Sequence, residues 1–206
     1  SMSGSFEQLH VPPTLISFAV TTEKISEICS NEFKGARHPV ILITPKYDAE
    51  GLPTASSLLK NFALVKHMMR KGRVLACYTP TYGGVAEAVL KMSLGNHIGF
   101  TYSDDISLTD IFGYRYGAFV LEMTDAANEV GIPLGMTAAE PVIRGHGVDL
   151  SLDMLQDIYE GILEPVFPCN ITQKQNCAIP VISFTERNTA KPRIRAAHPR
   201  VLIPVF

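Results

Sequence analysis

The chain has 206 residues, of which 46% are hydrophobic and 18% are charged, and its formal net charge is −2 at pH 7. This length fits one medium domain with flanking pieces, or two small domains. The small negative charge and the lack of a basic stripe argue against nucleic-acid binding. No apolar run approaches the roughly 20 residues that cross a membrane, and no signal peptide is recognisable. We therefore expect neither a nucleic-acid nor a membrane partner.

The four cysteines and six histidines have no spacing that indicates a metal site. No C-x-x-C pair occurs, so we predict free thiols, a cytoplasmic protein and no zinc site. Asp104 and Asp105 are adjacent, and in an extended segment they point to opposite faces. We interpret residues 103–109 as a solvated loop, with Mg²⁺ binding as the alternative.

Apolar runs and turn signals predict the strands. LISFAV at 15–20 is typical of a buried strand, and VILIT at 40–44 is rich in β-branched residues. Gly145, His146 and Gly147 indicate a hairpin turn, with an exposed histidine favoured over a ligand contact. The other predicted strands are 74–78, 98–101, 118–123, an extended run over 133–143 broken at Pro141, 148–150 and 179–184.

Three helices are predicted from apolar spacing and end signals. The first runs from 54 to 71, with Thr54 as its N-cap and Gly72 at its end. The second covers 84–94, with Gly95 as a left-handed terminator. The third covers 152–163, with Ser151 as its N-cap. The expected buried stripes are Ala55, Leu58, Leu59, Phe62, Val65 and Met69 in the first helix, and Leu152, Leu155, Ile158, Tyr159, Ile162 and Leu163 in the third.

The stretch from Tyr78 to Gly95 is the main candidate for a functional motif. A strand runs into a turn, Gly83 and Gly84 follow, and a helix starts at once. The first amides of a helix have no partner inside it and favour an anion. The turn therefore has two interpretations: a phosphate or carboxylate site, or a tight strand-to-helix connection that needs glycine.

These motifs resemble a known family. The segments VILITP (40–45), YTPTYGGVAEAVLKMSLGNHIGF (78–100), GAFVLEM (117–123) and PLGMTAAEPVIRGHGVDLSLDML (133–155) are similar to the C-terminal domain of the aminoimidazole ribonucleotide synthetase superfamily. Both ends, SMSGSFE and PRVLIPVF, resemble the large phosphoribosylformylglycinamidine synthases, in their second synthetase-like repeat. Ser1 to Gly4 also resemble a cloning scar.

The resemblance implies a fold and a domain plan. The expected fold is α+β, a layered mixed sheet of four or more strands with packed helices and a partly ferredoxin-like topology. Residues 1–22 would be the remnant of a preceding synthetase N-terminal domain, and 23–165 the synthetase-like C-terminal domain. Residues 166–199 would be a linker, and 200–206 the start of a glutaminase domain. The chain is thus expected to be a piece of a larger protein.

The resemblance also implies a reaction. The family's full enzyme is an ATP- and Mg²⁺-dependent ligase of purine biosynthesis that converts formylglycinamide ribonucleotide and glutamine to formylglycinamidine ribonucleotide. The implied partners are the other synthetase repeats and the glutaminase domain of the same polypeptide. The isolated piece would be inactive, because it lacks a complete synthetase pair and the glutaminase cysteine.

One departure from the family motif bears on the site. The usual turn reads His-Asp-x-Ser-Asp-Gly-Gly, whereas here Tyr82 precedes the glycines and no acid is present. We therefore expect no catalytic residue and no metal ligand in this piece. The predicted nucleotide-binding residues are Thr81, Gly83 and Gly84, in a domain that is mainly structural or lines a nucleotide site. The alternative is a non-catalytic interaction module without a nucleotide site.

Overall fold

A computed structural model describes residues 2–125 and 130–168. The chain divides into two units, Ser1–Phe167 and Pro168–Phe206. The predicted strand at 179–184, most of the predicted linker and the apolar stretch at 200–206 lie outside the described residues.

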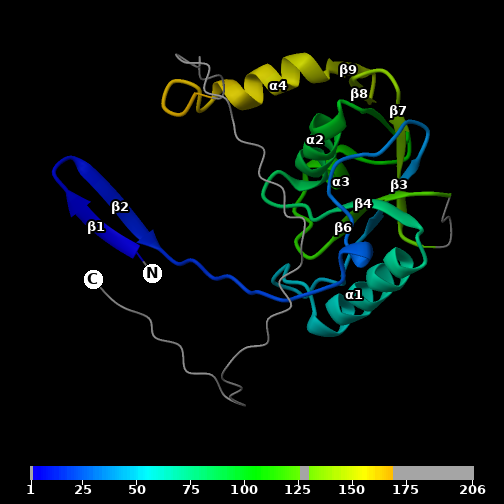
Figure 1. Cartoon of the computed structure of the whole chain (residues 1–206), viewed down its shortest axis with the longest axis horizontal. Coiled ribbons are helices and arrows are strands. Elements are labelled where there is room, and N and C mark those ends of the chain that lie inside the picture. The colour runs from blue at the N-terminus through cyan, green and yellow to red at the C-terminus, as the bar shows by residue number, and fades with distance from the viewer. Residues whose placement is uncertain (1, 126–129, 169–206) are drawn as a thin grey trace, which may run out of the picture. The chain divides into compact units, whose positions relative to one another are not determined.

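The elements follow the predicted order over most of the described chain (Figure 1). The helices are η1 (Ile25–Glu27, a 3₁₀ turn), α1 (Ala55–Arg70), α2 (Gly84–Asn96), α3 (Leu108–Phe112) and α4 (Leu152–Gly161). The strands are β1 (Met2–Phe6), β2 (Leu9–Thr14), β3 (Pro39–Ile43), β4 (Val74–Tyr78), β5 (Gly99–Tyr102), β6 (Phe119–Met123), β7 (Ile132–Ala138), β8 (Val142–Gly145) and β9 (Val148–Ser151). No helix among these is long and apolar enough to cross a membrane.

Seven strands form one mixed sheet in the order β4-β6-β3-β7-β5-β8-β9. β6 lies between β3 and β4 and is antiparallel to both, so β3, α1 and β4 make a split βαβ unit. β5 pairs with β8 in parallel, and the other neighbours are antiparallel. The predicted α+β class with a layered mixed sheet is confirmed.

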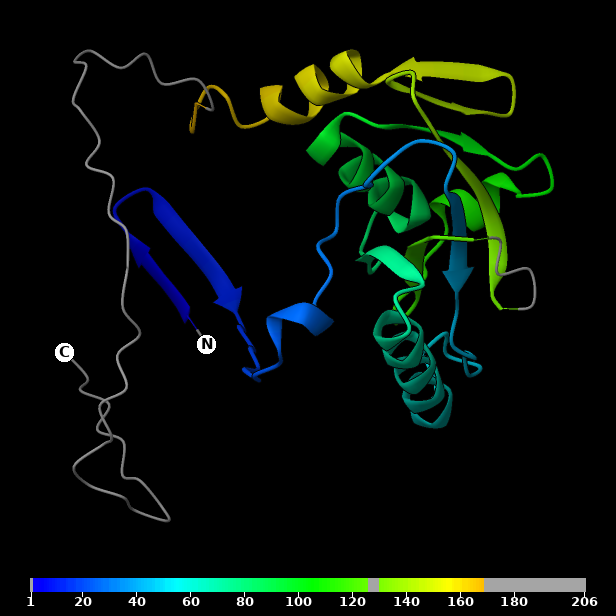
Figure 2. The ribbon, with the colours of Figure 1, turned by 45° about the vertical axis from the view of Figure 1, so that its right-hand side comes forward.

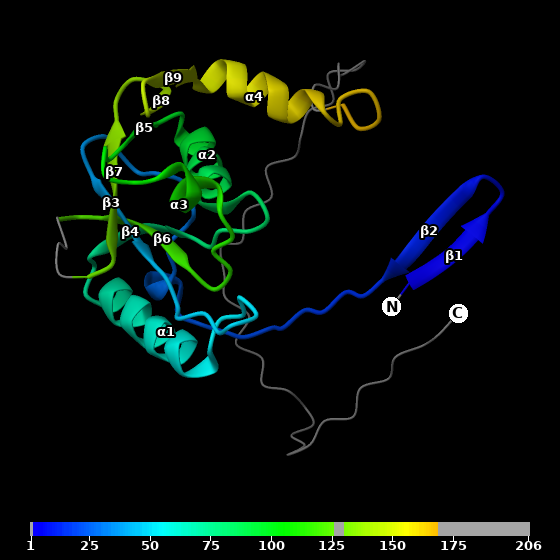
Figure 3. The ribbon, with the colours of Figure 1, turned by 180° about the vertical axis from the view of Figure 1, so that it is seen from behind.

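Helices cover both faces of the sheet, because the strands alternate their side chains between two cores. In β3, Val40 and Leu42 pack toward α2, whereas Ile41 and Ile43 pack toward α1. Figures 2 and 3 show α1 on one side of these strands and α2 with α3 on the other. The near-continuous apolar run in β3 therefore reflects burial on both faces.

The prediction of a strand at 15–20 is wrong. The structure gives these residues no regular secondary structure, and Phe18 is 85% exposed. A strand needs a hydrogen-bonding neighbour, and no described strand pairs with this segment. The chain forms instead a hairpin of β1 and β2, where no strand was predicted.

The second helix does not stop at Gly95. It continues to Asn96, and His97 takes the left-handed conformation with φ 56°. Gly95 serves packing, because a Cβ there would lie 2.4 Å from Cβ of Glu32. The helix α3, which begins at the end of the predicted loop 103–109, was missed, although Ser107 caps it by accepting the Asp110 N–H.

The predicted stripes of α1 and α4 are only partly buried. In α1, Val65 and Met68 are buried, whereas Leu59 is exposed. In α4, Leu152 is buried, but Ile158 and Leu163 are exposed. An amphipathic pattern predicts a helix with an apolar face, and only the sheet's extent decides how much of that face is covered. Thr54 and Ser151 stand at the predicted N-cap positions, but neither side chain accepts a backbone N–H of its helix. The Thr54 hydroxyl instead forms a hydrogen bond with the hydroxyl of Ser57 at 2.9 Å.

Candidate functional site

The turn before α2 is shaped by glycine. Gly84 has φ +67°, a conformation that side chains other than glycine rarely adopt. Its N–H donates to the carbonyl of Thr81 at 3.1 Å. A Cβ on Gly84 would lie 2.7 Å from the carbonyl oxygen of Gly113 and 3.0 Å from that of Ile111. Gly84 therefore allows the start of α2 to pack against the backbone of α3.

A carboxylate of the same helix closes this turn. Oε2 of Glu87 accepts the N–H of Gly83 and the hydroxyl of Thr81, each at 2.7 Å. Lys91 Nζ donates to the other oxygen, Oε1, at 2.6 Å. These bonds, that from Lys91 first, lower the pKa of Glu87 to about 2. The acid also suits the first turn of a helix, where the dipole favours negative charge.

The three predicted nucleotide-binding residues are thus close together. Thr81, Gly83 and Gly84 share one turn, as the strand-turn-helix pattern indicates. The amide of Gly83 and the hydroxyl of Thr81 already donate to Glu87. A phosphate that used these two donors would have to displace that carboxylate. Phosphate binding here remains a prediction.

Aromatic side chains stand beside the turn. The Tyr82 ring lies 5.9 Å from that of Tyr114, edge to face, and Tyr114 stacks on Tyr116 at 5.6 Å. Tyr82 is 77% exposed. The charge of the neighbouring Tyr82 raises the pKa of Tyr114. The position that carries an acid in the family motif therefore belongs to an exposed cluster of three tyrosines.

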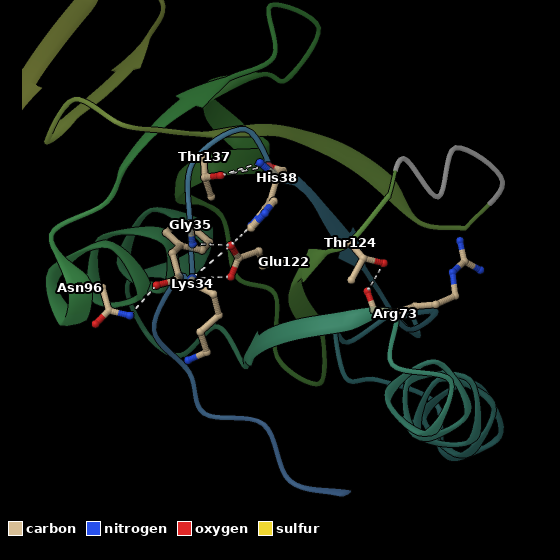
Figure 4. A network of polar contacts seen from close by, with 9 residues as sticks. Lys34, Gly35, His38, Arg73, Asn96, Glu122, Thr124 and Thr137 are labelled. Atoms are coloured by element: carbon tan, nitrogen blue, oxygen red, sulfur yellow. Dashed lines mark hydrogen bonds and ion pairs between the residues drawn. The ribbon is translucent and has the colours of Figure 1, made fainter. Parts of the chain in front are cut away.

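The sequence reasoning missed a buried carboxylate in β6. Glu122 is fully buried, and it accepts backbone N–H groups from Lys34 at 2.8 Å and Gly35 at 3.3 Å (Figure 4). Its Oε1 lies 2.7 Å from Nδ1 of His38. Thr137, also buried, accepts the N–H of His38 at 2.8 Å. The bonds fix the segment before β3 to the sheet.

Other predicted polar positions carry no assembled site. Asp104 and Asp105 lie in an exposed turn, as the loop interpretation expects. His146 is exposed in the β8–β9 turn, with φ 52°. Across residues 2–125 and 130–168, no three His, Cys, Asp or Glu side chains are grouped so that they could hold a metal ion. Burial raises the pKa of Cys77 to about 12, so its thiol is protonated at neutral pH.

The architecture is that of a layered α+β domain built on a seven-stranded mixed sheet. No protein-family model and no curated protein matches the sequence. Solved structures of proteins from Thermotoga maritima do match the fold. PurL complexed with FGAR is 11% identical at a TM-score of 0.53, covering 79% of this chain and 33% of that one.

Two further structures give the same result. PurLQS from T. maritima matches at a TM-score of 0.53 with 13% identity, over 80% of this chain and 32% of the other. Phosphoribosylformylglycinamidine synthase II from T. maritima matches at 0.50 with 13% identity, over 74% and 30%. This chain spans about a third of the chains it matches. At these identities the likeness establishes the fold, and it confirms the fold that the motifs predicted.

Proposed function

We propose that the chain is a supporting domain of an ATP-dependent formylglycinamidine synthetase of purine biosynthesis. Two findings support this assignment, namely the resemblance of the motifs and the fold shared with T. maritima PurL, which was solved in complexes with FGAR and with ATP. The observation that carries the supporting role is the contact of Glu87 with Gly83 and Thr81, which fills the turn with the protein's own carboxylate. The domain would act with the synthetase repeats and a glutaminase domain of one cytoplasmic polypeptide, with ATP and Mg²⁺ in the full enzyme.

The absence of an acid before the glycines supports a domain without a catalytic residue of its own. Tyr82 packs on Tyr114, and it places a phenol where the family motif has a carboxylate that could hold a metal. The test is a ligase assay of the 206-residue chain with formylglycinamide ribonucleotide, ATP, Mg²⁺ and glutamine. We expect no formylglycinamidine ribonucleotide, and turnover by the chain alone would overturn the supporting role.

The position of the Gly83–Gly84 turn supports a second role for the domain, in which the turn lines a nucleotide site. It lies at the start of a 13-residue helix, where the dipole attracts a phosphate. When a phosphate displaces Glu87 from Gly83 and Thr81, Lys91 loses its carboxylate partner and becomes available to the same anion. Thr81, Gly83 and Gly84 would then line the phosphate.

An ADP titration distinguishes a turn that lines a nucleotide site from a turn that is only structural. ADP with Mg²⁺ is titrated into the wild type, Glu87→Ala and, as a control outside the turn, Glu50→Ala, and binding is read from the thermal midpoint. A turn that lines a nucleotide site predicts saturable stabilisation that is larger in Glu87→Ala than in the other two proteins. If none of the three responds to ADP, the turn is only structural and the chain is an interaction module.

A further inference from the structure

Arg37 has an unusual backbone conformation for its residue type. Its φ is +68°, in the left-handed region that residues with a Cβ disfavour. The Arg37 N–H donates to the carbonyl of Thr137 at 2.8 Å, and the next residue, His38, is held by Thr137 and Glu122. Strained residues that their surroundings hold in place are concentrated at functional sites.

The Arg37 side chain is also the exception among the arginines of residues 2–125 and 130–168. Each of the others pairs with a carboxylate: Arg70 with Glu27, Arg73 with Asp125, Arg115 with Asp110, and Arg144 with Glu140 and Asp149. Arg37 is exposed, and no described residue pairs with its guanidinium. Five N–H donors on a planar fork are thus available to a ligand.

Arg37 belongs to the lining of a groove of about 740 Å³. The groove lies over β3, β7 and β5. Thr101 and Ser103 contribute polar lining, and Pro39, Pro133 and Met136 contribute apolar lining. Gly135, also in the lining, lets β7 lie close to β5, since a Cβ there would lie 2.0 Å from the carbonyl oxygen of Thr101. Small-molecule sites have volumes of roughly 300–1,000 Å³ and combine apolar walls with a few polar groups.

The electrostatics of the groove favour an anion. Asp125 is an acid in its lining, and Arg73 pairs with it at 3.1 Å. The positive charge of Arg37 is therefore left without local compensation among the described lining residues. Arginine recognises phosphate and carboxylate through two parallel hydrogen bonds.

We propose that this groove binds a small organic oxyanion, a phosphate ester or a carboxylate, whose oxygens accept hydrogen bonds from Arg37. The organic part lies on Pro39, Pro133 and Met136, and Thr101 and Ser103 offer hydroxyls to it. The groove shares no residue with the Gly83–Gly84 turn, so this proposal can be tested separately from nucleotide binding at that turn.

The test compares matched small probes on the full chain by amide NMR. Phenyl phosphate, benzoate and inorganic phosphate are titrated, and the signals of Arg37, Thr101, Ser103 and Gly135 are followed. We expect saturable shifts with phenyl phosphate or benzoate, and the tighter of the two identifies the headgroup. Inorganic phosphate should bind at least threefold more weakly, because it has no apolar part.

Variants assign the binding to the guanidinium. Arg37→Gln should weaken the tighter probe at least tenfold, and Arg37→Lys should lie between it and the wild type, because it keeps the charge and loses the fork. Arg70→Gln, another exposed arginine outside the groove, should bind as the wild type does. The proposal is overturned if Arg37→Gln binds unchanged, if inorganic phosphate binds as tightly as both organic probes, or if the shifts are confined to the Gly83–Gly84 turn.

Discussion

Glu122 and His38 are 84 residues apart in the sequence, and Oε1 of the first lies 2.7 Å from Nδ1 of the second. The same carboxylate accepts the backbone N–H groups of Lys34 and Gly35. Glu122 of β6 therefore holds Lys34, Gly35 and His38 in the segment before β3, and Thr137 holds the strained Arg37 between them. A buried carboxyl group is tolerated here because both of its oxygens accept backbone hydrogen bonds.

Removing this carboxylate should be strongly destabilising. Glu122→Ala leaves the backbone N–H groups of Lys34 and Gly35 without their acceptor at a site that excludes most water. We expect the free energy of unfolding to fall by about 3 kcal/mol. Urea denaturation followed by circular dichroism measures it. Glu50→Ala, at an exposed turn position, is the control and should change the free energy by less than about 0.5 kcal/mol. A loss below 1 kcal/mol for Glu122→Ala would show that water replaces the carboxylate.

Gly84 and Gly72 allow backbone strain and packing to be separated. Both have φ +67°, but a Cβ on Gly72 meets nothing within 4 Å, whereas one on Gly84 meets the carbonyl oxygen of Gly113 at 2.7 Å. Gly72→Ala should cost about 1 kcal/mol, the left-handed penalty alone. Gly84→Ala should cost about 3 kcal/mol, because α2 must also move from α3. Equal losses in thermal or urea unfolding would mean that the α2–α3 contact adjusts freely.

The closed turn predicts a pH dependence of stability. The pKa of Glu87 is lowered from 4.5 to about 2, so its ionised form is favoured in the folded state. Its contribution is complete above pH 4.5 and is lost as the pH falls toward 2. Glu87→Gln should be less stable than the wild type at pH 6, and the difference should shrink on acidification. Urea unfolding of both proteins between pH 6 and pH 2.5 tests this, and a difference that grows in acid would contradict it.

Arg37 should be a position where stability and binding oppose each other. Arg37→Gly removes a left-handed penalty of about 1–2 kcal/mol, partly offset by the larger entropy of glycine in the unfolded chain. The expected net gain is up to about 1 kcal/mol in urea unfolding. Arg37→Ala keeps the strain and should show no gain. A destabilised glycine variant would indicate that the arginine side chain supports the fold through packing.

Much of this fold was determined locally. β4 has the predicted bounds, Val74–Tyr78, and α1 differs from its prediction by one residue at each end. The spacing of apolar residues, the turn glycines and the helix-end signals each act within a few residues. They therefore predict helices and strands without knowledge of the tertiary structure. The glycine pair before α2 predicted the strand-turn-helix connection for the same reason. The likeness to the synthetase motifs is also a property of short local segments.

Only the tertiary structure decided what these features contact. Whether 15–20 becomes a strand depends on a neighbour elsewhere in the chain, and how much of α4 is buried depends on the sheet's extent. The partners of Glu122 come from a segment more than 80 residues away, and the role of Gly84 depends on the backbone of α3. Sequence spacing carries no information about such distant contacts, because they arise only when the strands are ordered in the sheet. The lack of a carboxylate partner for Arg37 among the described residues is likewise a tertiary feature, because the strand order decides which side chains line its groove.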